Sequence, residues 1–546
     1  MTTTVEVISA FLATAGLQRM YGVPGEGSSL DLIEAVRRAG IEFVATHHTS
    51  EAAIMAATDA DLSCQAGVCV LPRGLGVAAA IPGLAYAYLD RVPMIVVFEG
   101  PPRAARRIGP RRALDHRQLF RGVTKDGATI TSPRAHRLIT WAWEEASAAP
   151  AGPVYLELPS DEALRPAKRR APSPVRRETE EPSPNAIRKI ARLLIRAGRA
   201  VVVAGMGCRD GKVPLALRDL VEHLGSPIFT TQRAKGVIPE DHPLAAGIFA
   251  GGRAEEELLN RAECVLAVGL DSVEMLPRSW RLTPPVASLR AYRGSPAPFE
   301  AEAEAVGDLA MGLRQLREEL PPAGEWSFAD WAKRGERFRA RMRGLLAEAG
   351  RARGSQLMAP HRVVEIAREV FPRPTLAVVD AGAHSLAVAA FWDAYEPKGY
   401  ICSGGQGGAG YAVSAAVGAR LAATDRPVLA FMGERGLFLG LAEAATASQL
   451  RVALTIIVFL DESFSWARIA QEQKRYAPVG GAMGAMDIPS LAEGLGACAV
   501  VVEDEEALRA ALQEAAGMTT PAIVAARVNP HGYRRMVELL RGKAGH

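Results

Sequence analysis

The sequence predicts an α/β protein built from three doubly wound parallel-sheet domains. Short apolar runs alternate along the whole chain with segments of helical periodicity, which is typical of βαβ units. The 546 residues are enough for about three domains of ~150–200 residues each. Glycine-rich turns follow several of the runs, at the sheet edge where such proteins bind ligands.

The expected strands fall into three groups separated by two boundary segments. The first boundary is the charged, proline-rich segment 167–184, and the second is a basic helix around 337–355. The strands are Glu42–Thr46, Val68–Leu71, Met94–Phe98, Val154–Leu158, Ala200–Ala204, Pro227–Thr230, Cys264–Val268, Thr375–Val379, Val428–Met432, Ala453–Leu460, Ala499–Val502 and Ala522–Arg527.

Composition narrows the class of protein. Apolar residues make up 49% and charged residues 23%, and the formal net charge is +4, which favours neither nucleic acid nor membrane as a partner. No apolar run approaches the ~18 residues of a membrane span, and the N-terminus lacks a basic and then apolar leader, so we expect a cytoplasmic protein. Six scattered cysteines without a CxxC pair predict mainly buried free thiols.

The most informative segment is Met432–Gly436. It follows an apolar strand and precedes an expected helix, Leu437–Gln449, after which a second apolar strand ends on Asp461. Acids at the carboxyl ends of neighbouring parallel strands suit a divalent cation, and the start of a helix suits a phosphate group. The segment therefore predicts a metal and diphosphate site.

Several motifs carry a resemblance to a known family. In chain order they are Tyr21–Glu26, Gly67–Gly76, Gly83–Pro93, Phe120–Lys125, Gly152–Pro159, Thr230–Pro243 and Ser403–Tyr411. Together they resemble the acetolactate synthase-like branch of the thiamine-diphosphate (ThDP) enzyme superfamily, in one consistent order over nearly the whole chain. The resemblance implies a pyrimidine-binding-like domain at 1–166, a middle domain at 185–345 and a diphosphate-binding-like domain at 355–546.

The family places a glutamate against the pyrimidine ring of ThDP, in a pattern like Arg-His-Glu-x-x-Ala-Ala. The segment Thr46–Ala53 takes that place here, and an ungapped count puts Thr49 at the glutamate position. Threonine is no base near neutral pH. Glu51 lies roughly 200° further around a helix than Thr49 and so faces away from it, and we expect Glu51 to be a solvated or helix-N-terminal acid. The alternative is a local shift of the backbone that brings Glu51 into the catalytic position.

His48, Thr49 and Glu51 are the candidate catalytic residues. The resemblance also assigns cofactor binding to Gly25, Gly74, His384, Gln406, Gly407, Gly408, Ala409, Gly433, Glu434 and Arg435. It implies Mg²⁺ held by Glu434, Asp461 and the carbonyl of Ser463.

Three cofactor positions depart from the family pattern. Ala409 stands where a bulky residue bends ThDP, and Glu434-Arg435 replaces the Asp-Gly of a Gly-Asp-Gly metal motif. Arg435 has two readings of equal weight. It contacts the phosphate or substitutes for the metal charge, or it forms a cluster with the acids that plugs an empty site.

Two further features bear on ligands. Gly205–Gly211 is a glycine turn at the place where some relatives hold FAD. A glycine-rich turn alone is weak evidence for a nucleotide, so an empty turn is the main expectation and bound FAD is the alternative. A run of arginines, Arg103, Arg106, Arg107, Arg111, Arg112, Arg117 and Arg121, either attracts an anionic small-molecule substrate or is a solvated surface.

Three functions are consistent with these residues. The first is a divergent ThDP-dependent lyase or transferase that forms or cleaves a C–C bond next to a carbonyl, in a 2-oxo acid class substrate, without the glutamate. The second is a ThDP-independent enzyme that reuses the same interdomain cleft. The third is a non-catalytic partner or ligand-binding subunit. The resemblance implies a homodimer or a dimer of dimers in every case.

Overall fold

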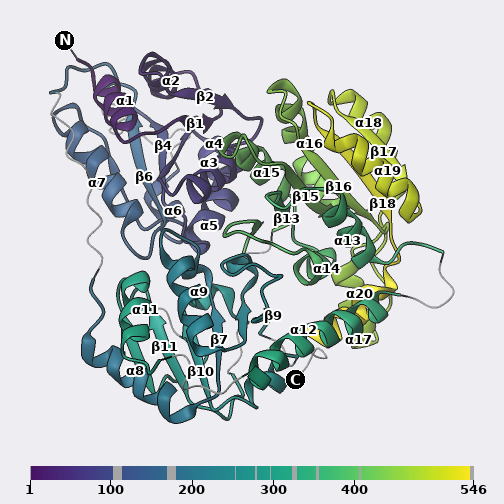
Figure 1. The fold of residues 1–546 in the computed structure, drawn as a ribbon. Coiled ribbons are helices and arrows are strands. Elements are labelled where there is room, and N and C mark those ends of the chain that lie inside the picture. The colour runs from purple at the N-terminus through teal and green to yellow at the C-terminus, as the bar shows by residue number, and fades with distance from the viewer. Residues whose placement is uncertain are drawn as a thin grey trace. The chain divides into compact units, whose positions relative to one another are not determined.

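The structure is a computed structural model that describes residues 2–102, 114–168, 180–251, 254–276, 280–294, 297–322, 329–351, 356–404 and 408–541 (Figure 1). The chain forms two compact units. Unit 1 comprises 1–178, 413–424 and 440–452, and unit 2 comprises 179–412, 425–439 and 453–546. In the described residues, no helix is both long and apolar enough to cross a membrane.

Unit 1 contains a six-stranded parallel sheet in the order β2-β1-β3-β4-β6-β5. Its strands are β1 (Arg19–Gly22), β2 (Glu42–Ala45), β3 (Gly67–Leu71), β4 (Met94–Gly100), β5 (Asp126–Thr129) and β6 (Pro153–Pro159). The helices of this unit include α1 (Thr4–Thr14), α2 (Ser28–Arg38), α3 (Thr49–Ser63), α4 (Leu75–Ala79), α5 (Ile81–Leu89), α6 (His116–Phe120) and α7 (Ala135–Ser147).

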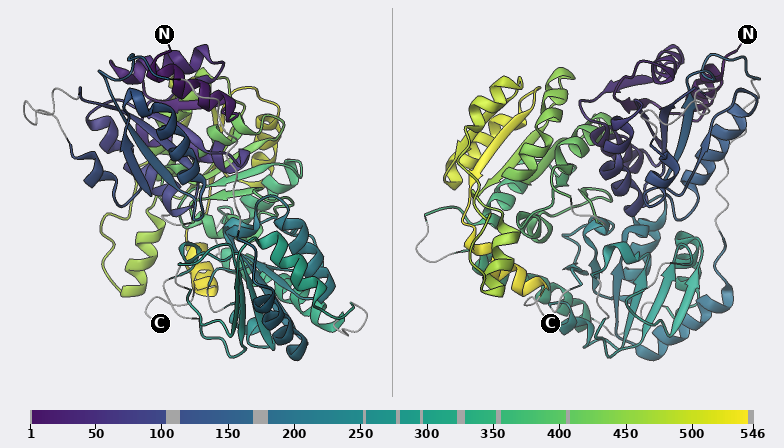
Figure 2. Two further views of the ribbon diagram at one scale, coloured as in Figure 1. Left: turned by 90° about the vertical axis from the view of Figure 1, so that its left-hand side faces the viewer. Right: turned by 180° about the vertical axis from the view of Figure 1, so that it is seen from behind.

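Both faces of this sheet are covered (Figure 2). Alternate residues such as Val68, Val70, Ile95 and Val97 form one core with α1, α2 and α7, because side chains alternate between the faces of a strand. Helix α3 packs against β1 and β3 and also against α5, which contacts β6. Near-continuous apolar strands are what a parallel sheet buried on both faces requires.

Unit 2 contains two more six-stranded parallel sheets, ordered β12-β11-β10-β7-β8-β9 and β14-β13-β15-β16-β18-β17. The first has strands β7 (Ala200–Ala204), β8 (Ile228–Thr230), β9 (Ala245–Ile248), β10 (Cys264–Val268), β11 (Val286–Arg290) and β12 (Ala303–Val306). Its helices are α8 (Pro184–Ala197), α9 (Val213–Leu224), α10 (Glu256–Leu259), α11 (Leu309–Glu318) and α12 (Ala329–Gly350).

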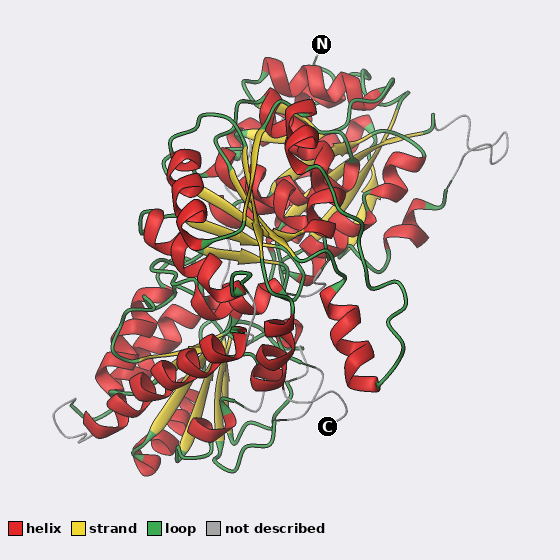
Figure 3. Ribbon diagram, turned by 90° about the vertical axis from the view of Figure 1, so that its right-hand side faces the viewer, coloured by secondary structure: helices red, strands yellow, loops and turns green. Residues whose placement is uncertain are grey.

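The first sheet of unit 2 separates two cores, with helices on both sides (Figure 3). Val202 and Leu266 face the core shared with α8, α9 and α11, whereas Val201 and Val265 face Trp331 and Phe338 of α12. The indole N–H of Trp331 donates to the carbonyl of Ala200 at 2.6 Å, so α12 is attached to the sheet by a polar contact as well as by burial.

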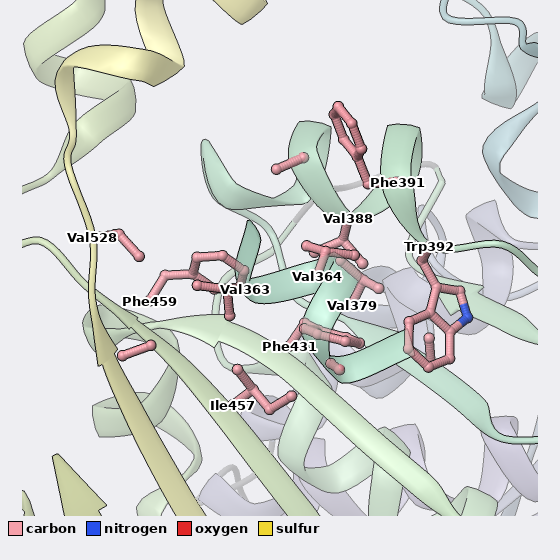
Figure 4. Packing of buried hydrophobic residues seen from close by; sticks show 14 of the residues in the cluster. Val363, Val364, Val379, Val388, Phe391, Trp392, Phe431, Ile457, Phe459 and Val528 are labelled. Atoms are coloured by element: carbon pink, nitrogen blue, oxygen red, sulfur yellow. The ribbon is translucent and has the colours of Figure 1, made fainter. Parts of the chain in front are cut away.

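The second sheet of unit 2 carries the candidate metal segment. Its strands are β13 (Leu376–Val379), β14 (Tyr400–Cys402), β15 (Val428–Gly433), β16 (Thr455–Leu460), β17 (Cys498–Val502) and β18 (Ala522–Arg527). The associated helices are α13 (Pro360–Val370), α14 (His384–Phe391), α17 (Ser465–Lys474), α18 (Ile488–Gly494), α19 (Glu505–Ala516) and α20 (His531–Arg541). Helix α15 (Tyr411–Ala422) belongs to unit 1 from Val413 onward, and α16 (Glu434–Gln449) belongs to unit 1 from Gly440 onward. Figure 4 shows Val363 and Val364 of α13 packed with Phe431 and Phe459.

Every strand predicted from the sequence is present, and the fold class is confirmed. The expected start of the helix after the acidic turn was wrong, because α16 begins at Glu434 and not at Leu437. Glu434 therefore occupies the first helical turn, where an acid is stabilised by the helix dipole. The six cysteines form no disulfide, and four of them are buried, whereas Cys64 and Cys498 are exposed.

Candidate functional site

Thr49 opens α3 at the carboxyl edge of the unit 1 sheet. Its side chain is 4% exposed, and its hydroxyl has no hydrogen-bond partner among the described residues. A Cβ built on Gly76 would lie 3.5 Å from the Thr49 methyl group, so the threonine faces the glycine loop after β3. His48 precedes the helix, and its Nδ1 accepts the Ser50 N–H at 3.3 Å.

Glu51 lies one step further along the same helical turn. Its carboxylate accepts a hydrogen bond from the hydroxyl of Ser414, which belongs to the same unit. Glu51 is therefore a helix-N-terminal acid with a hydroxyl partner. That arrangement agrees with the non-catalytic interpretation of this residue, while the catalytic role stays a prediction.

A buried carboxylate that sequence reasoning missed lies behind this turn. Glu443 is fully buried and accepts the backbone N–H groups of His47 and His48, each at 3.1 Å. Thr446 donates to the same carboxylate at 2.5 Å, and Nδ1 of His47 lies 2.8 Å from the Thr446 hydroxyl. In the sequence, the only sign of this buried role is that Glu443 is a single acid in an otherwise apolar helical stretch.

Two predicted glycines of unit 1 have clear steric reasons. A Cβ on Gly25 would lie 2.4 Å from the Ser29 hydroxyl, so there is no room for a side chain at this position. Gly74 has φ +84°, a left-handed conformation that favours glycine. The Ser29 hydroxyl donates to the buried Glu99 at 3.0 Å, which fixes the turn after β1 against β4.

In unit 2, Glu434 is 2% exposed and lies at the carboxyl end of β15. Its Oε2 accepts the backbone N–H groups of Asp461 and Glu462, at 3.2 and 2.7 Å. Oε1 is buried and has no partner in the described chain. Burial, and then the charge of Asp461, raise the pKa of Glu434 to about 7.

Asp461 is held by Ser463, which the resemblance assigns to the metal through its carbonyl, and by Ser465, which the sequence did not single out. Its Oδ1 accepts both the N–H and the hydroxyl of Ser463 at 3.0 Å, and Oδ2 accepts the hydroxyl of Ser465. Burial raises the pKa of this carboxyl, while the serine hydrogen bonds act in the opposite direction. Both oxygens of Asp461 are thus already engaged within the protein.

His384 and Asp380 line the end of β13. The imidazole is buried, stacks on Phe459 at 5.3 Å, and has an Nε2 without a partner among the described residues. Burial lowers the pKa of His384 to about 4, so the ring is neutral near pH 7. Asp380 accepts the N–H of Gly410 at 3.0 Å, which holds the glycine loop after β14.

Arg435 is not paired with the acids next to it in the described chain. It is exposed, and its guanidinium lies 5.7 Å from the ring centroid of Phe464. Within the described ranges, Arg435 forms no ion pair with Glu434 or Asp461. The hypothesis that Arg435 plugs the site therefore finds no support here, and its exposed charge remains available to an anion.

Some predicted positions lie outside the described residues, namely Gln406, Gly407 and the arginines from Arg103 to Arg112. Gly408 is exposed and Ala409 half-buried. In the Gly205–Gly211 turn, the N–H of Met206 donates to Glu274 at 2.8 Å. One donor of that turn is therefore already used by a protein carboxylate.

The residues of unit 2 fit a phosphate group better than they fit a cation. The unpartnered Nε2 of His384 and the exposed Arg435 offer contacts to an anion. For a cation, Glu434 has one unengaged oxygen, whereas both oxygens of Asp461 accept hydrogen bonds. In the part of the chain that is described, no group of three His, Cys, Asp or Glu side chains forms a metal cluster.

Comparisons with known proteins agree with this geometry. Family models of the thiamine pyrophosphate enzyme match the chain at residues 2–121 (N-terminal TPP binding domain), 187–290 (central domain) and 380–526 (C-terminal TPP binding domain). The crystal structure of benzoylformate decarboxylase from Polynucleobacter necessarius superposes with a TM-score of 0.86 at 17% identity, over 97% of this chain and 99% of that one.

Two relatives extend the comparison by sequence. The catabolic acetolactate synthase of Raoultella terrigena is 26% identical, covering 96% of this chain and 94% of its own. A probable 2-ketoarginine decarboxylase of Pseudomonas aeruginosa is 29% identical, with coverages of 85% and 83%.

The fold and the site define a thiamine-diphosphate-type α/β enzyme scaffold. The chain belongs to the thiamine-diphosphate-dependent enzyme superfamily, in its acetolactate synthase-like branch.

Proposed function

We propose that the protein is a ThDP-dependent enzyme that forms or cleaves a C–C bond next to a carbonyl group, without a glutamate base. The substrate class is the 2-oxo acids. The TPP binding domains support the cofactor, and the relatives named as an acetolactate synthase and a 2-ketoarginine decarboxylase support the reaction class. When bound, ThDP supplies a carbon nucleophile for carbonyl groups.

The observation that carries the proposal is the buried, unpartnered hydroxyl of Thr49. The resemblance to the family pattern puts Thr49 at the glutamate position, and in the described part of unit 1 the acids Glu51 and Glu443 accept hydrogen bonds from protein donors. The Thr49 hydroxyl can orient a nitrogen-bearing ring by one hydrogen bond, but it cannot remove a proton at neutral pH. Removal of the proton from ThDP must therefore be carried out by groups other than Thr49.

On the phosphate side, the chain's own residues have separate tasks. His384 would hold the diphosphate, and the guanidinium of Arg435 would neutralise part of its charge. Glu434, through Oε1, would contact Mg²⁺ together with Asp461 and Ser463. This requires Asp461 to exchange serine hydrogen bonds for the cation.

Calorimetric titration with ThDP, with and without MgCl₂, tests the proposal. We expect saturable ThDP binding that survives Thr49→Val, together with turnover of isotopically labelled pyruvate or benzoylformate followed by NMR. No binding of ThDP contradicts the proposal. An activity that is lost in Arg435→Gly but is indifferent to ThDP would instead favour a ThDP-independent enzyme. Co-purification with a second subunit and no turnover would favour a non-catalytic partner.

We also infer a homodimer or a dimer of dimers, as the family resemblance implies. Light scattering after size-exclusion chromatography tests this point. A monomer at micromolar concentration would contradict it.

A further inference from the structure

The glycine turn Gly205–Gly211 lies where the first sheet of unit 2 would hold a dinucleotide. The chain runs outward from β7 through β8 to β9, and it then returns to the other side of β7 with β10. Open α/β sheets bind ligands at such a reversal of strand order, and a glycine-rich turn after the first strand takes the phosphate groups. The turn follows β7 directly, so its position suits a nucleotide diphosphate. Its contacts decide whether one can enter.

The backbone donors of this turn are already engaged. A phosphate is held by several backbone N–H groups that point at it. Here the N–H groups of Gly205 and Gly207 donate to the carbonyls of Val268 and Gly269, at 2.8 and 2.9 Å. The N–H of Cys208 donates to the carbonyl of Gly205 at 2.9 Å. These three donors bind the protein's own backbone and are not available to a phosphate.

The glycines of the turn are explained by packing within the protein. A Cβ on Gly205 would lie 2.6 Å from the carbonyl oxygen of Gly269 and 2.6 Å from Cα of Leu270. A Cβ on Gly207 would lie 3.0 Å from the same carbonyl oxygen. In a dinucleotide-binding turn, glycine allows the phosphate to approach the backbone. In this chain it allows the loop after β10 to approach instead.

The remaining N–H of the turn, that of Met206, donates to Glu274. The Glu274 carboxylate accepts this N–H at 2.8 Å, the hydroxyl of Thr231 at 2.5 Å and the N–H of Asp271 at 3.4 Å. The three donors follow β7, β8 and β10, the strands that meet at the reversal of strand order. We call these three donors the phosphate seat, because a phosphate at this crevice would need the same groups.

The charges at the phosphate seat also disfavour a nucleotide. Asp271 is only 4% exposed, and it brings a second carboxylate close to Glu274. Two nearby cations already have acidic partners: Lys398 pairs with Asp210 at 2.6 Å, and the charge of Arg233 acts on Glu274 itself. A nucleotide diphosphate is strongly negative, so the two carboxylates would repel it.

We propose that the Glu274 carboxylate occupies the phosphate seat of the middle domain, so that this domain accepts neither FAD nor a free nucleoside diphosphate. The domain keeps the topology of a nucleotide-binding fold and uses its crevice for contacts between its own loops. This inference concerns the middle domain alone and does not depend on the use of ThDP.

The test is hydrogen exchange of the Met206 amide in the full-length protein, followed by mass spectrometry. It is done at pH 8, above the pKa of about 7 to which burial raises Glu274. In the wild type, we expect FAD, ADP and inorganic phosphate to leave this exchange unchanged. In Glu274→Ala, the amide loses its acceptor and should exchange about tenfold faster. Inorganic phosphate should slow it again, because the vacated donors can hold another anion.

Glu263→Ala is the matched control. Glu263 precedes β10, and its carboxylate accepts the N–H of Arg199, just before β7, at 3.2 Å. The substitution therefore removes a similar acid at the opposite end of the same two strands. The Met206 amide should exchange as in the wild type, with and without phosphate.

Four results would overturn the assignment. They are binding of FAD to the wild type, slower exchange of the wild-type Met206 amide with ADP, wild-type exchange in Glu274→Ala, and no response of Glu274→Ala to phosphate. Glu274→Asp, whose carboxylate is one methylene shorter, serves if Glu274→Ala does not fold. It should show a smaller acceleration and a smaller response to phosphate, and exchange identical to that of the wild type would contradict the assignment.

Discussion

The candidate site residues of unit 1 and those of unit 2 use their acids in opposite ways. In unit 1, Glu51 accepts a serine hydroxyl, and Glu443 accepts two backbone N–H groups and a threonine hydroxyl. In unit 2, Asp380 and Glu434 each keep one buried oxygen without a partner in the described chain, and burial raises the pKa of each to about 7. Unit 1 has built its acids into the scaffold, whereas unit 2 retains acceptors that a ligand can use.

The largest effect is expected from a substitution that places an extra methyl group against Asp380, one of the two acids of unit 2 with an unpartnered oxygen in the described chain. A Cβ on Gly436 would lie 2.0 Å from Oδ2 of Asp380. We expect Gly436→Ala to destabilise unit 2 by about 3 kcal/mol or more, because Asp380 must move and lose its bond to Gly410. Differential scanning calorimetry should show a lower melting temperature.

Gly344→Ala in α12 is the control for that substitution. No atom lies within 4 Å of its added Cβ, and alanine favours a helix over glycine by about 1 kcal/mol. The melting temperature should stay the same or rise. Equal effects of the two substitutions would contradict the close approach of Gly436 to Asp380.

The second test concerns pH and Glu274, whose pKa burial raises to about 7 from an ordinary value of 4.5. The folded state holds this proton more tightly, so the stabilisation is complete below pH 4.5 and is lost as pH rises through 7. The loss amounts to roughly 3 kcal/mol. Glu274→Gln should therefore raise the melting temperature more at pH 8 than at pH 5. If the melting temperature of Glu274→Gln depends on pH in the same way as that of the wild type, the raised pKa of Glu274 is refuted.

The third test removes the scaffold acid of unit 1. Glu443→Ala leaves the N–H groups of His47 and His48 without their acceptor, at an expected cost of about 2 kcal/mol. Hydrogen exchange of these two amides should accelerate. Ser414→Ala, which removes only the hydroxyl donor to Glu51, should leave them protected.

The smallest effect is expected at Thr49. Because its hydroxyl has no partner among the described groups, Thr49→Val should change stability by less than about 1 kcal/mol. A larger loss, measured by thermal unfolding, would show that the hydroxyl is engaged in solution.

Sequence reasoning predicted the fold more completely than the site. Long apolar strands such as β10 and β18 were visible, whereas β1 and β14 are short, contain polar or aromatic residues, and were missed. The acids at 434 and 461 were recognised because they follow strands. Glu443 was not, because its contact with His47 spans 396 positions in the chain. The burial that shifts Asp380 and His384 is likewise a property of packing and not of local sequence.

The central claim is that the cofactor is used without a base at position 49. Its most direct test is the rate of deuterium exchange at the thiazolium carbon of ThDP bound to the wild type and to Thr49→Glu, measured by NMR after rapid quenching. We expect a wild-type rate close to that of free ThDP, and an increase of about 100-fold or more in Thr49→Glu, the usual contribution of a positioned acid–base group. Wild-type exchange that is already accelerated to that extent, with no further gain in Thr49→Glu, would contradict it.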